Sequence, residues 1–187
     1  MITEMNEATP RTTMIAVLCD GRASELVGVR LLLASLRRNS PNTAVRAYLA
    51  PALIEQHRAE LARLHPRVEL VGYTCPESWA CKPFVLLDAL SRAEGDTRIL
   101  WLDTDILVLK PLDELRARAP ATMLVAEETN PTLNLQVQDA QRMLGLEVGP
   151  PRATTISSAV VGVTRQHAAV LERWREGVTS EPFHKQQ

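Results

Sequence analysis

The segment Ile99-Leu100-Trp101-Leu102-Asp103-Thr104-Asp105-Ile106-Leu107-Val108-Leu109 sets two carboxylates between two runs of apolar residues. Side chains alternate along an extended strand, so residues i and i+2 point to the same side. The pattern predicts that Asp103 and Asp105 converge at the end of a buried strand. Unpaired anions near a core are expensive to desolvate, and a hard divalent cation takes oxygen ligands. We interpret the pair as a binding site for Mg²⁺ or Mn²⁺ and a diphosphate.

The same residues admit a plainer interpretation, in which a strand ends in a polar turn and Thr104 or Asp105 caps the next element. A turn needs neither apolar run, whereas a site at the carboxyl end of a central strand needs the first one. Open α/β sheets bind their ligands at that edge. The flanking apolar runs therefore favour the metal–diphosphate site.

Lys82 is the second feature of interest, because it immediately precedes Pro83 at the start of a predicted helix. The helix dipole disfavours a cation at the amino end, and helix amino termini are ready binding sites for phosphate. A bound anion between the helix and Lys82 would explain the lysine, although a solvated lysine is the simpler alternative. The D-x-D pair some twenty residues later favours the anion.

Composition places the chain among ordinary globular proteins. Its 187 residues suffice for one domain with a full core, and 45% are apolar and 23% charged. A net charge of −1 gives no support to a nucleic acid or an anionic membrane as partner. No apolar run approaches the ~20 residues of a membrane span, and the first thirteen residues resemble no targeting peptide. We expect residues 1–13 to be disordered.

The three cysteines, Cys19, Cys75 and Cys81, are an odd number without paired spacing. We therefore expect reduced thiols and a cytoplasmic protein.

Short apolar runs alternate with segments of helical period along the chain. The pattern predicts strands over residues 14–19, 44–49, 68–71, 99–102, 123–126 and 158–163. It predicts helices over residues 24–38, 54–64, 83–90, 135–144 and 167–174. Strands that alternate with helices in this way form βαβ units and a mostly parallel sheet. The expected fold is a three-layer, Rossmann-like α/β domain over residues 14–187.

Four stretches together resemble the glycosyltransferases of the GT-A fold, in particular the family-8 enzymes related to glycogenin and the galactosyltransferases. They are the helix from Gly28 to Leu36 (G-x-x-x-L-x-x-S-L), the Lys82-Pro83 pair, the W-x-D-x-D segment, and the strand 155–163, which is similar to F-N-S-G-V. The resemblance spans roughly residues 14 to 175.

The resemblance implies a metal-dependent glycosyltransferase that moves a sugar from a nucleotide-diphosphate donor to a glycan or small-molecule acceptor with retention. Mn²⁺ or Mg²⁺ would be held by Asp103 and Asp105. The implied donor-binding residues are Cys19, Asp20, Lys82, Asp103, Thr104 and Asp105. Cys19 and Asp20 would line the base pocket, and Lys82 would reach the phosphate or ribose.

The resemblance also implies roles around the sugar. Glu127 or Glu128 would meet the donor sugar, Ser157 and Ser158 would face sugar or acceptor, and Gln187 falls at the catalytic D-Q pair of the family. Four positions depart from the family pattern. Ser157 replaces an Asn, Ala159 replaces a Gly, Gln186 stands where the acid of the D-Q pair is expected, and the aromatic residue that often stacks on the base falls near Glu25.

The H-x-G-x-x-K-P segment that closes the donor site in the family has no counterpart here. We therefore expect an open donor cleft that is closed by residues from outside this chain, either a longer natural C-terminus or a neighbouring subunit of a homo-oligomer.

The main alternative is a nucleotide-sugar-binding or interaction module of the same fold that has lost turnover. A haloacid-dehalogenase-like phosphatase is a less favoured alternative, and the sequence argues against a nucleotidyltransferase. The phosphatases carry their D-x-D near the chain start and a Thr or Val where this chain has Leu107. A nucleotidyltransferase would need a longer Gly-rich, basic loop than Gly21-Arg22.

Overall fold

The computed structural model describes residues 12–74, 80–113, 115, 123–128, 142 and 155–180. Its first half contains β1 (Thr12–Cys19), α1 (Ala23–Asn39), β2 (Ala44–Leu49), α2 (Pro51–Leu64) and β3 (Val68–Gly72). Its second half contains α3 (Lys82–Ser91), β4 (Thr97–Leu102), β5 (Leu124–Glu128), β6 (Thr155–Val163), the 3₁₀ turn η1 (Arg165–His167) and α6 (Ala168–Val178).

These elements match the predicted strands and helices within a few residues. β1 begins at Thr12, two residues before the predicted strand, so Thr12 and Thr13 belong to the sheet. The helix predicted over 135–144 lies outside the described residues except for residue 142. Residues 1–11 also lie outside them, and the division into a disordered segment and a single domain stays a prediction.

The six strands form one sheet in the order β3-β2-β1-β4-β6-β5. β1 pairs in parallel with β2 and β4, and β2 pairs in parallel with β3. β6 runs antiparallel to both β4 and β5. The prediction of a mostly parallel α/β sheet is confirmed, with β6 as the reversed strand.

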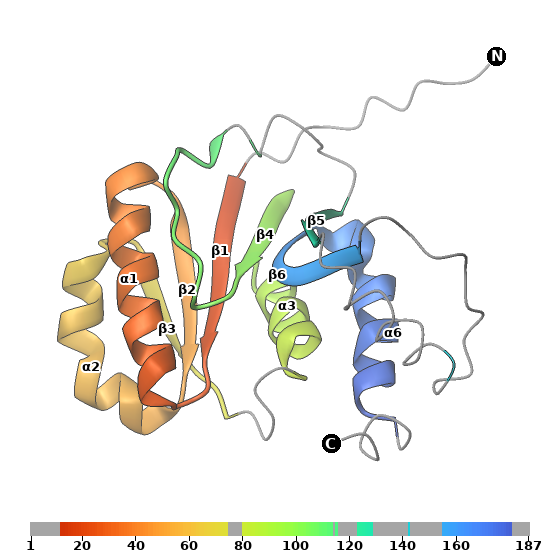
Figure 1. Cartoon of the computed structure of the whole chain (residues 1–187), viewed down its shortest axis with the longest axis horizontal. Helices are drawn as coiled ribbons and strands as arrows, with labels where there is room; N and C mark the ends of the chain where they lie inside the picture. The colour runs from red at the N-terminus through yellow and green to blue at the C-terminus, as the bar shows by residue number, and fades with distance from the viewer. Residues whose placement is uncertain are drawn as a thin grey trace.

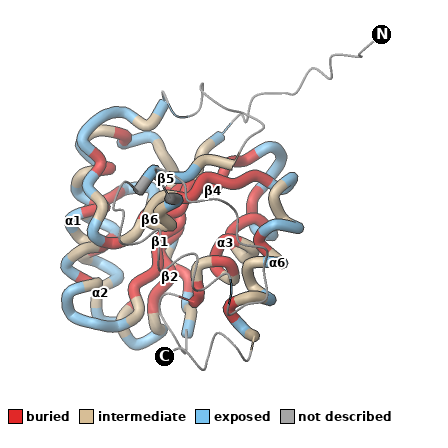
Figure 2. Tube along the Cα trace, turned by 45° about the vertical axis from the view of Figure 1, so that its right-hand side comes forward, coloured by how far each residue is buried: buried red, intermediate tan, exposed pale blue. Residues whose placement is uncertain are grey.

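Helices cover both faces of this sheet, which confirms the three layers (Figure 1). One core cluster joins β1 residues Ile15 and Val17 to the buried side of α1 and α2. A second cluster joins Ala16 and Leu18 to α3 and α6. The alternation along β1 thus sends neighbouring residues to opposite faces of the sheet. Figure 2 shows the buried residues concentrated on the central strands and on the helix sides that face them.

The sheet has a topological switch point between β1 and β4. The chain moves from β1 outward to β2 and β3, and β4 then returns to the other side of β1. Because β1 and β4 are parallel, with Ala16 opposite Trp101, their carboxyl ends meet at the same edge. Ligands of open α/β sheets bind at such a point. Asp20 follows β1 there and Asp103 follows β4.

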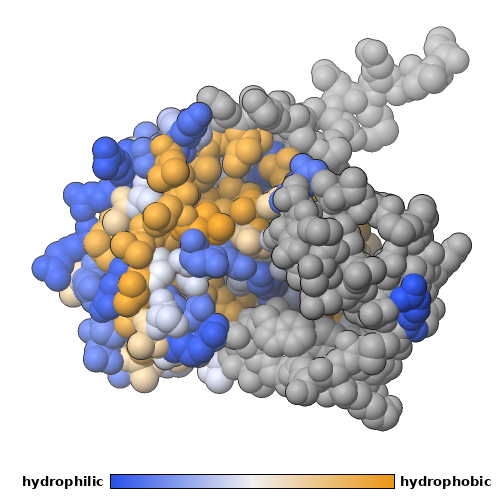
Figure 3. Space-filling model, in the orientation of Figure 1, coloured by the Kyte–Doolittle hydropathy of each residue, from blue (hydrophilic) through white to orange (hydrophobic). Residues whose placement is uncertain are grey.

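The segment after β4 is not a strand, although it is apolar. Val108 is buried in the core beneath α1, whereas Leu107 and Leu109 are 52% and 79% exposed. Figure 3 shows apolar side chains gathered over α1 and this segment. Within the described residues, none of the helices has the length and apolar character needed to cross a membrane.

The cysteines differ from the expectation of three reduced thiols. Cys19 is a free, buried thiol, but Cys81 is disulfide-bonded. An odd number of cysteines without paired spacing therefore does not exclude a disulfide. Because disulfides are uncommon in the cytosol, the cytoplasmic location stays a prediction.

Candidate functional site

A cavity of about 180 Å³ lies at the switch point between β1 and β4. Four carboxylates and two cationic side chains line it, which leaves a formal charge of −2. An acidic cavity of this kind attracts cations. The lining residues are Leu18, Asp20, Arg22, Glu25, Lys82, Trp101, Asp103, Thr104 and Asp105.

A larger cavity of about 990 Å³ lies at the opposite edge of the sheet, where β1, β2 and β4 begin. Three arginines and three acids line it, so it has no net charge of its own, and none of the D-x-D residues reaches it. The smaller cavity is therefore the candidate site.

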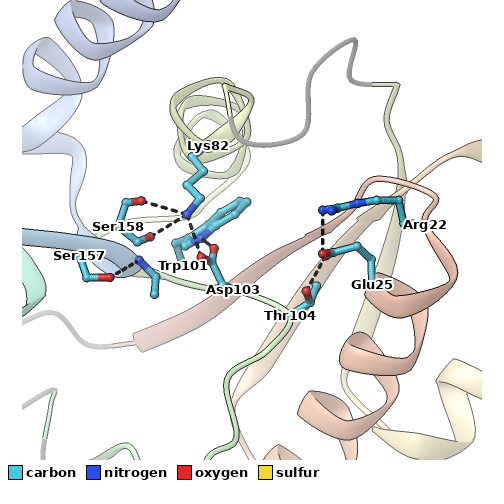
Figure 4. A network of polar contacts seen from close by, with 9 residues as sticks. Arg22, Glu25, Lys82, Trp101, Asp103, Thr104, Ser157 and Ser158 are labelled. Carbon is cyan, nitrogen blue, oxygen red and sulfur yellow. Dashed lines mark hydrogen bonds and ion pairs between the residues drawn. The ribbon is translucent and has the colours of Figure 1, made fainter. Parts of the chain in front are cut away.

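Asp103 is fixed in place by three contacts, and Figure 4 shows the two side-chain ones, with Lys82 and Trp101. Its Oδ1 accepts a hydrogen bond of 2.6 Å from the indole Nε1 of Trp101, and its Oδ2 forms a 2.9 Å ion pair with Lys82. Its backbone N–H donates to the carbonyl of Ala159 on β6, 2.9 Å away. The carboxylate therefore has a partner within the chain, before any cation is considered.

Lys82 is the first residue of α3, which begins one position earlier than the helix predicted from Pro83, and its side chain extends to the end of β4 and to β6. Its Nζ donates to Asp103 Oδ2 and also to the carbonyl and the hydroxyl of Ser158, at 3.1 and 3.0 Å. It lies 5.7 Å from the centre of the Trp101 ring, within the range of a cation–π contact. In this structure Lys82 therefore contacts Asp103 and Ser158. The phosphate or ribose contact implied by the resemblance stays a prediction.

Asp103 and Asp105 meet at the cavity for a reason other than the predicted one. β4 ends at Leu102, and the N–H of Ile106 donates to the carbonyl of Asp103 at 3.1 Å, which closes a turn. The two aspartates are consequently brought together by a turn, and strand alternation has no part in it. Asp105 is exposed, while Asp103 is half-buried.

Helix α1 positions this turn through a series of contacts along one side. At Gly28, a Cβ atom would lie against the carbonyl oxygen of Thr104 and 2.9 Å from its carbonyl carbon. About two helical turns further along α1, Ser35 Oγ accepts from the N–H of Val108 at 3.1 Å, and Asn39 Nδ2 donates to the Val108 carbonyl at 2.7 Å. These contacts explain physically why the helix carries Gly and Ser at these positions.

A second polar chain closes the other end of the cavity. Arg22 pairs with Asp20 at 2.7 Å and with Glu25 at 2.9 Å, and Glu25 accepts a hydrogen bond from the Thr104 hydroxyl. Figure 4 shows Arg22, Glu25 and Thr104 in line. Arg22 and Glu25 were not predicted as site residues. Arg22 lies in the short loop after β1 and Glu25 in the first turn of α1, so their closeness to the carboxyl end of a buried strand is the signal that could have found them.

The structure separates two residues that the sequence placed together in a base pocket. Asp20 lines the cavity, but Cys19 lies in the core beneath α1, where burial raises the pKa of its thiol. Consecutive strand residues point to opposite faces, so Leu18 takes the place beside Asp20 that was expected for Cys19.

The predicted sugar and acceptor residues lie apart from the cavity lining. Ser158 reaches it only through Lys82, and Ser157 Oγ accepts from the N–H of Ala159 at 3.3 Å. Glu127 is exposed on β5, two strands away from β4. Glu128 also belongs to β5, but its side chain lies outside the described part of the structure, as does Gln187. Their roles stay predictions.

The donor atoms at the cavity fit a hard divalent cation in type and charge. Asp105 is exposed at the cavity, and the lining has an excess of two negative charges. Oxygen ligands of this kind suit Mg²⁺ or Mn²⁺, which leave positions open for substrate phosphates. Among residues 12–74, 80–113 and 155–180 and the shorter described stretches, no group of three metal-ligating side chains occurs. Metal binding by Asp103 and Asp105 therefore stays a prediction.

Solved structures with the same fold include glycosyltransferases. Mouse xyloside xylosyltransferase 1 matches with a TM-score of 0.55 and 15% identity, over 94% of this chain and 73% of that one. The galactosyltransferase LgtC matches with a TM-score of 0.50 and 18% sequence identity, over 91% of this chain and 61% of that one. These neighbours confirm the GT-A fold. The chain spans less than two thirds of the length of LgtC.

The same fold also occurs in a protein of different description. The 4-diphosphocytidyl-2C-methyl-D-erythritol synthase of Anaerococcus prevotii matches with a TM-score of 0.57 and 11% identity, over 91% of this chain and 76% of that one. No family model matches the sequence, and no curated protein does. The likeness establishes the fold, and the reaction has to be argued from the site.

Proposed function

We propose that this chain is a metal-dependent glycosyltransferase that moves a sugar from a nucleotide-diphosphate donor to a glycan or small-molecule acceptor, with retention. One observation carries the proposal: an acidic cavity holding Asp103 and Asp105 lies at the switch point of a GT-A sheet. Retention is supported by the family-8 resemblance of the motifs alone.

Asp103 and Asp105 hold the Mn²⁺ or Mg²⁺ ion in this proposal, with Asp105 as the more accessible ligand. Held there, the ion would supply positive charge against the negative charge that develops on the leaving nucleoside diphosphate. Trp101 and Lys82 orient Asp103, and α1 holds the turn through Gly28. The residues of the chain therefore supply a preorganised anchor for the diphosphate.

The other end of the cavity fits the nucleoside part of the donor. Asp20 and Glu25 provide hydrogen-bond acceptors and Arg22 provides donors, which suits ribose hydroxyls and the polar edge of a base. No aromatic side chain lies at that end among the lining residues, since Trp101 contacts Asp103 and Lys82.

The rival functions fit this site less well. A haloacid-dehalogenase-like phosphatase would carry this motif near the chain start, whereas here it follows β4, and Leu107 stands where that family has a Thr or Val. A nucleotidyltransferase needs a free basic loop after β1, whereas Arg22 is paired with two carboxylates. A binding module without turnover has the same cavity, so only a transfer assay separates it from an enzyme.

The test is a titration of UDP-, GDP- and ADP-sugars in the presence of Mn²⁺, followed by an assay for sugar transfer. We expect one donor to bind, and a chelator to weaken its binding by about tenfold or more. Asp105→Ala should weaken binding equally, with little loss of apo stability because it relieves repulsion between neighbouring carboxylates. Calorimetry measures the affinity and urea unfolding the stability.

Asp96→Ala serves as the matched control, because Asp96 is an exposed aspartate at the opposite edge of the sheet. It should leave the affinity unchanged. If donor affinity stays the same after chelation and in Asp105→Ala, the metal site is wrong. Binding without transfer would identify the chain as a nucleotide-sugar-binding module.

A further inference from the structure

Lys82 uses its whole donor capacity on the protein itself. An ammonium group has three N–H donors, and three acceptors surround Nζ: Asp103 Oδ2 at 2.9 Å, Ser158 Oγ at 3.0 Å and the Ser158 carbonyl at 3.1 Å. The side chain is only 11% exposed. A phosphate oxygen can therefore bind Lys82 only by replacing one of these acceptors.

Asp103 is the partner that another cation can take over. Its Oδ1 is held by the indole of Trp101, and its Oδ2 is paired with Lys82, so its charge is already compensated. Asp105, two residues away, is exposed and makes no hydrogen bond or ion pair within the described part of the chain. The D-x-D motif thus contains one occupied and one open carboxylate.

A divalent cation that arrives alone meets the positive charge of Lys82 beside Asp103. A cation bound to Asp103 and the ammonium group of Lys82 would repel each other, and this repulsion is stronger where the groups are partly shielded from water. A diphosphate changes this balance, because its anionic oxygens accept hydrogen bonds from Lys82 while the cation takes the carboxylate. The diphosphate thus compensates the charge of Lys82, and the cation compensates the charge of Asp103, so each ligand favours the binding of the other.

We propose that Lys82 is a resident counter-ion of Asp103 that is exchanged for the metal ion only when a diphosphate binds. Cation and nucleoside diphosphate then bind with positive cooperativity, and each raises the affinity for the other by the same factor. This inference rests on the proposed function, because it concerns the same metal–diphosphate site. In this inference, Lys82 weakens the binding of the metal ion alone and strengthens the binding of the nucleoside diphosphate.

The experiment removes the charge of Lys82 and measures the two ligands separately. In Lys82→Met, Mn²⁺ alone should bind about fivefold to tenfold more tightly, since the competing cation is gone. The nucleoside diphosphate should bind at least about tenfold more weakly at saturating Mn²⁺. Electron paramagnetic resonance of free Mn²⁺ measures the first affinity, and calorimetry with UDP, GDP, ADP and CDP measures the second.

Two further variants control the result. Lys82→Arg keeps the charge and should behave like the wild type in the Mn²⁺ titration. Lys110→Met removes an exposed lysine outside the cavity lining and should change neither affinity. Thermal unfolding of Lys82→Met checks its fold, because this variant leaves Asp103 without its ion pair.

The wild type alone already tests the cooperativity. Its Mn²⁺ affinity should rise about fivefold or more when the best-binding nucleoside diphosphate is present. Equal Mn²⁺ affinity with and without that diphosphate would overturn the exchange, and so would a Lys82→Met variant in which both ligands bind more weakly. Either result leaves the proposed function standing. A wild type that binds neither Mn²⁺ nor any nucleoside diphosphate would overturn both proposals.

Discussion

The two aspartates of the D-x-D motif have different environments in this protein. Asp103 is held by Lys82 and Trp101, whereas Asp105 is exposed beside the same cavity. An ion pair inside the chain thus provides part of the compensation that the sequence assigned to a metal ion. A carboxylate of fixed direction is a better anchor than a mobile one, because its orientation is settled before the ligand arrives.

His65 is the residue whose titration should affect stability most directly. It is fully buried at the end of α2, and its Nδ1 accepts from the N–H of Arg67 at 3.3 Å. Burial, followed by the charges of Arg37 and Arg67, lowers the pKa of His65 below its ordinary value of 6.5. The histidine is therefore neutral in the folded protein under conditions where the unfolded chain binds a proton.

We expect the free energy of unfolding to fall as the pH drops from 7.5 to 5. The unfolded state gains a proton below about pH 6.5 that the folded state does not, at up to about 1.4 kcal/mol per pH unit. Urea unfolding at several pH values measures this slope. The His65→Asn variant should be less stable than the wild type at pH 7.5, but its free energy of unfolding should change less between pH 7.5 and 5.

His57 provides the matched control for this prediction. It is only half-buried and contacts Glu60 at 3.3 Å. His57→Asn should retain the slope of the wild type. If the free energy of unfolding of His65→Asn depends on pH as steeply as that of the wild type, other groups cause the pH dependence.

Among the elements, α1 has a role beyond covering the sheet. Its inner residues fill the core, while Gly28, Ser35 and Asn39 contact the chain between Thr104 and Val108. In the proposed site, α1 would thus support the ligand indirectly by holding this turn, in addition to the direct contact that Glu25 offers from the cavity lining. The cavity therefore depends on the close approach of α1 to the backbone at Thr104.

Gly28→Ala tests this dependence. Alanine normally stabilises a helix interior relative to glycine by about 0.5–1 kcal/mol. Here the added methyl group would meet the backbone of Thr104, so we expect a loss of about 1–3 kcal/mol from overpacking. Urea unfolding gives the stability, and calorimetry should show weaker donor binding as well.

Gly177→Ala is the corresponding control on α6. No atom lies within 4 Å of a Cβ built at Gly177. This substitution should be neutral or stabilising, with unchanged donor affinity. Equal effects of the two substitutions would show that the contact with Thr104 has no influence on the site.

At the scale of the whole molecule, the site joins β1, β4, β6, α1 and α3. A ligand that binds there stabilises the folded state only, by about 2.7 kcal/mol at a concentration of one hundred times its dissociation constant. For a domain of this size, we expect the melting temperature to rise by roughly 5–10 °C with Mn²⁺ and the best donor nucleotide. Differential scanning calorimetry measures the shift.

The shift should disappear with a chelator and in Asp105→Ala. A shift of the same size in Asp105→Ala would place the nucleotide elsewhere, and the larger cavity at the opposite edge of the sheet would then be the candidate.

The sequence by itself determined the elements of this protein and their order. Hydrophobic periodicity is local, so the strands and helices were predicted within a few residues, and their alternation identified the mostly parallel sheet. The D-x-D segment identified the cavity, because a motif at the end of a buried strand lies at the ligand-binding edge of such a sheet.

Only the tertiary structure decided which side chains meet there. Lys82 pairs with Asp103 across 21 positions and with Ser158 across 76, and Glu25 meets Thr104 across 79. The turn after Leu102 and the inward direction of Cys19 also follow from packing. Periodicity specifies the face on which a residue lies, but its partner depends on how distant elements pack together, and that packing made Lys82 the counter-ion of Asp103.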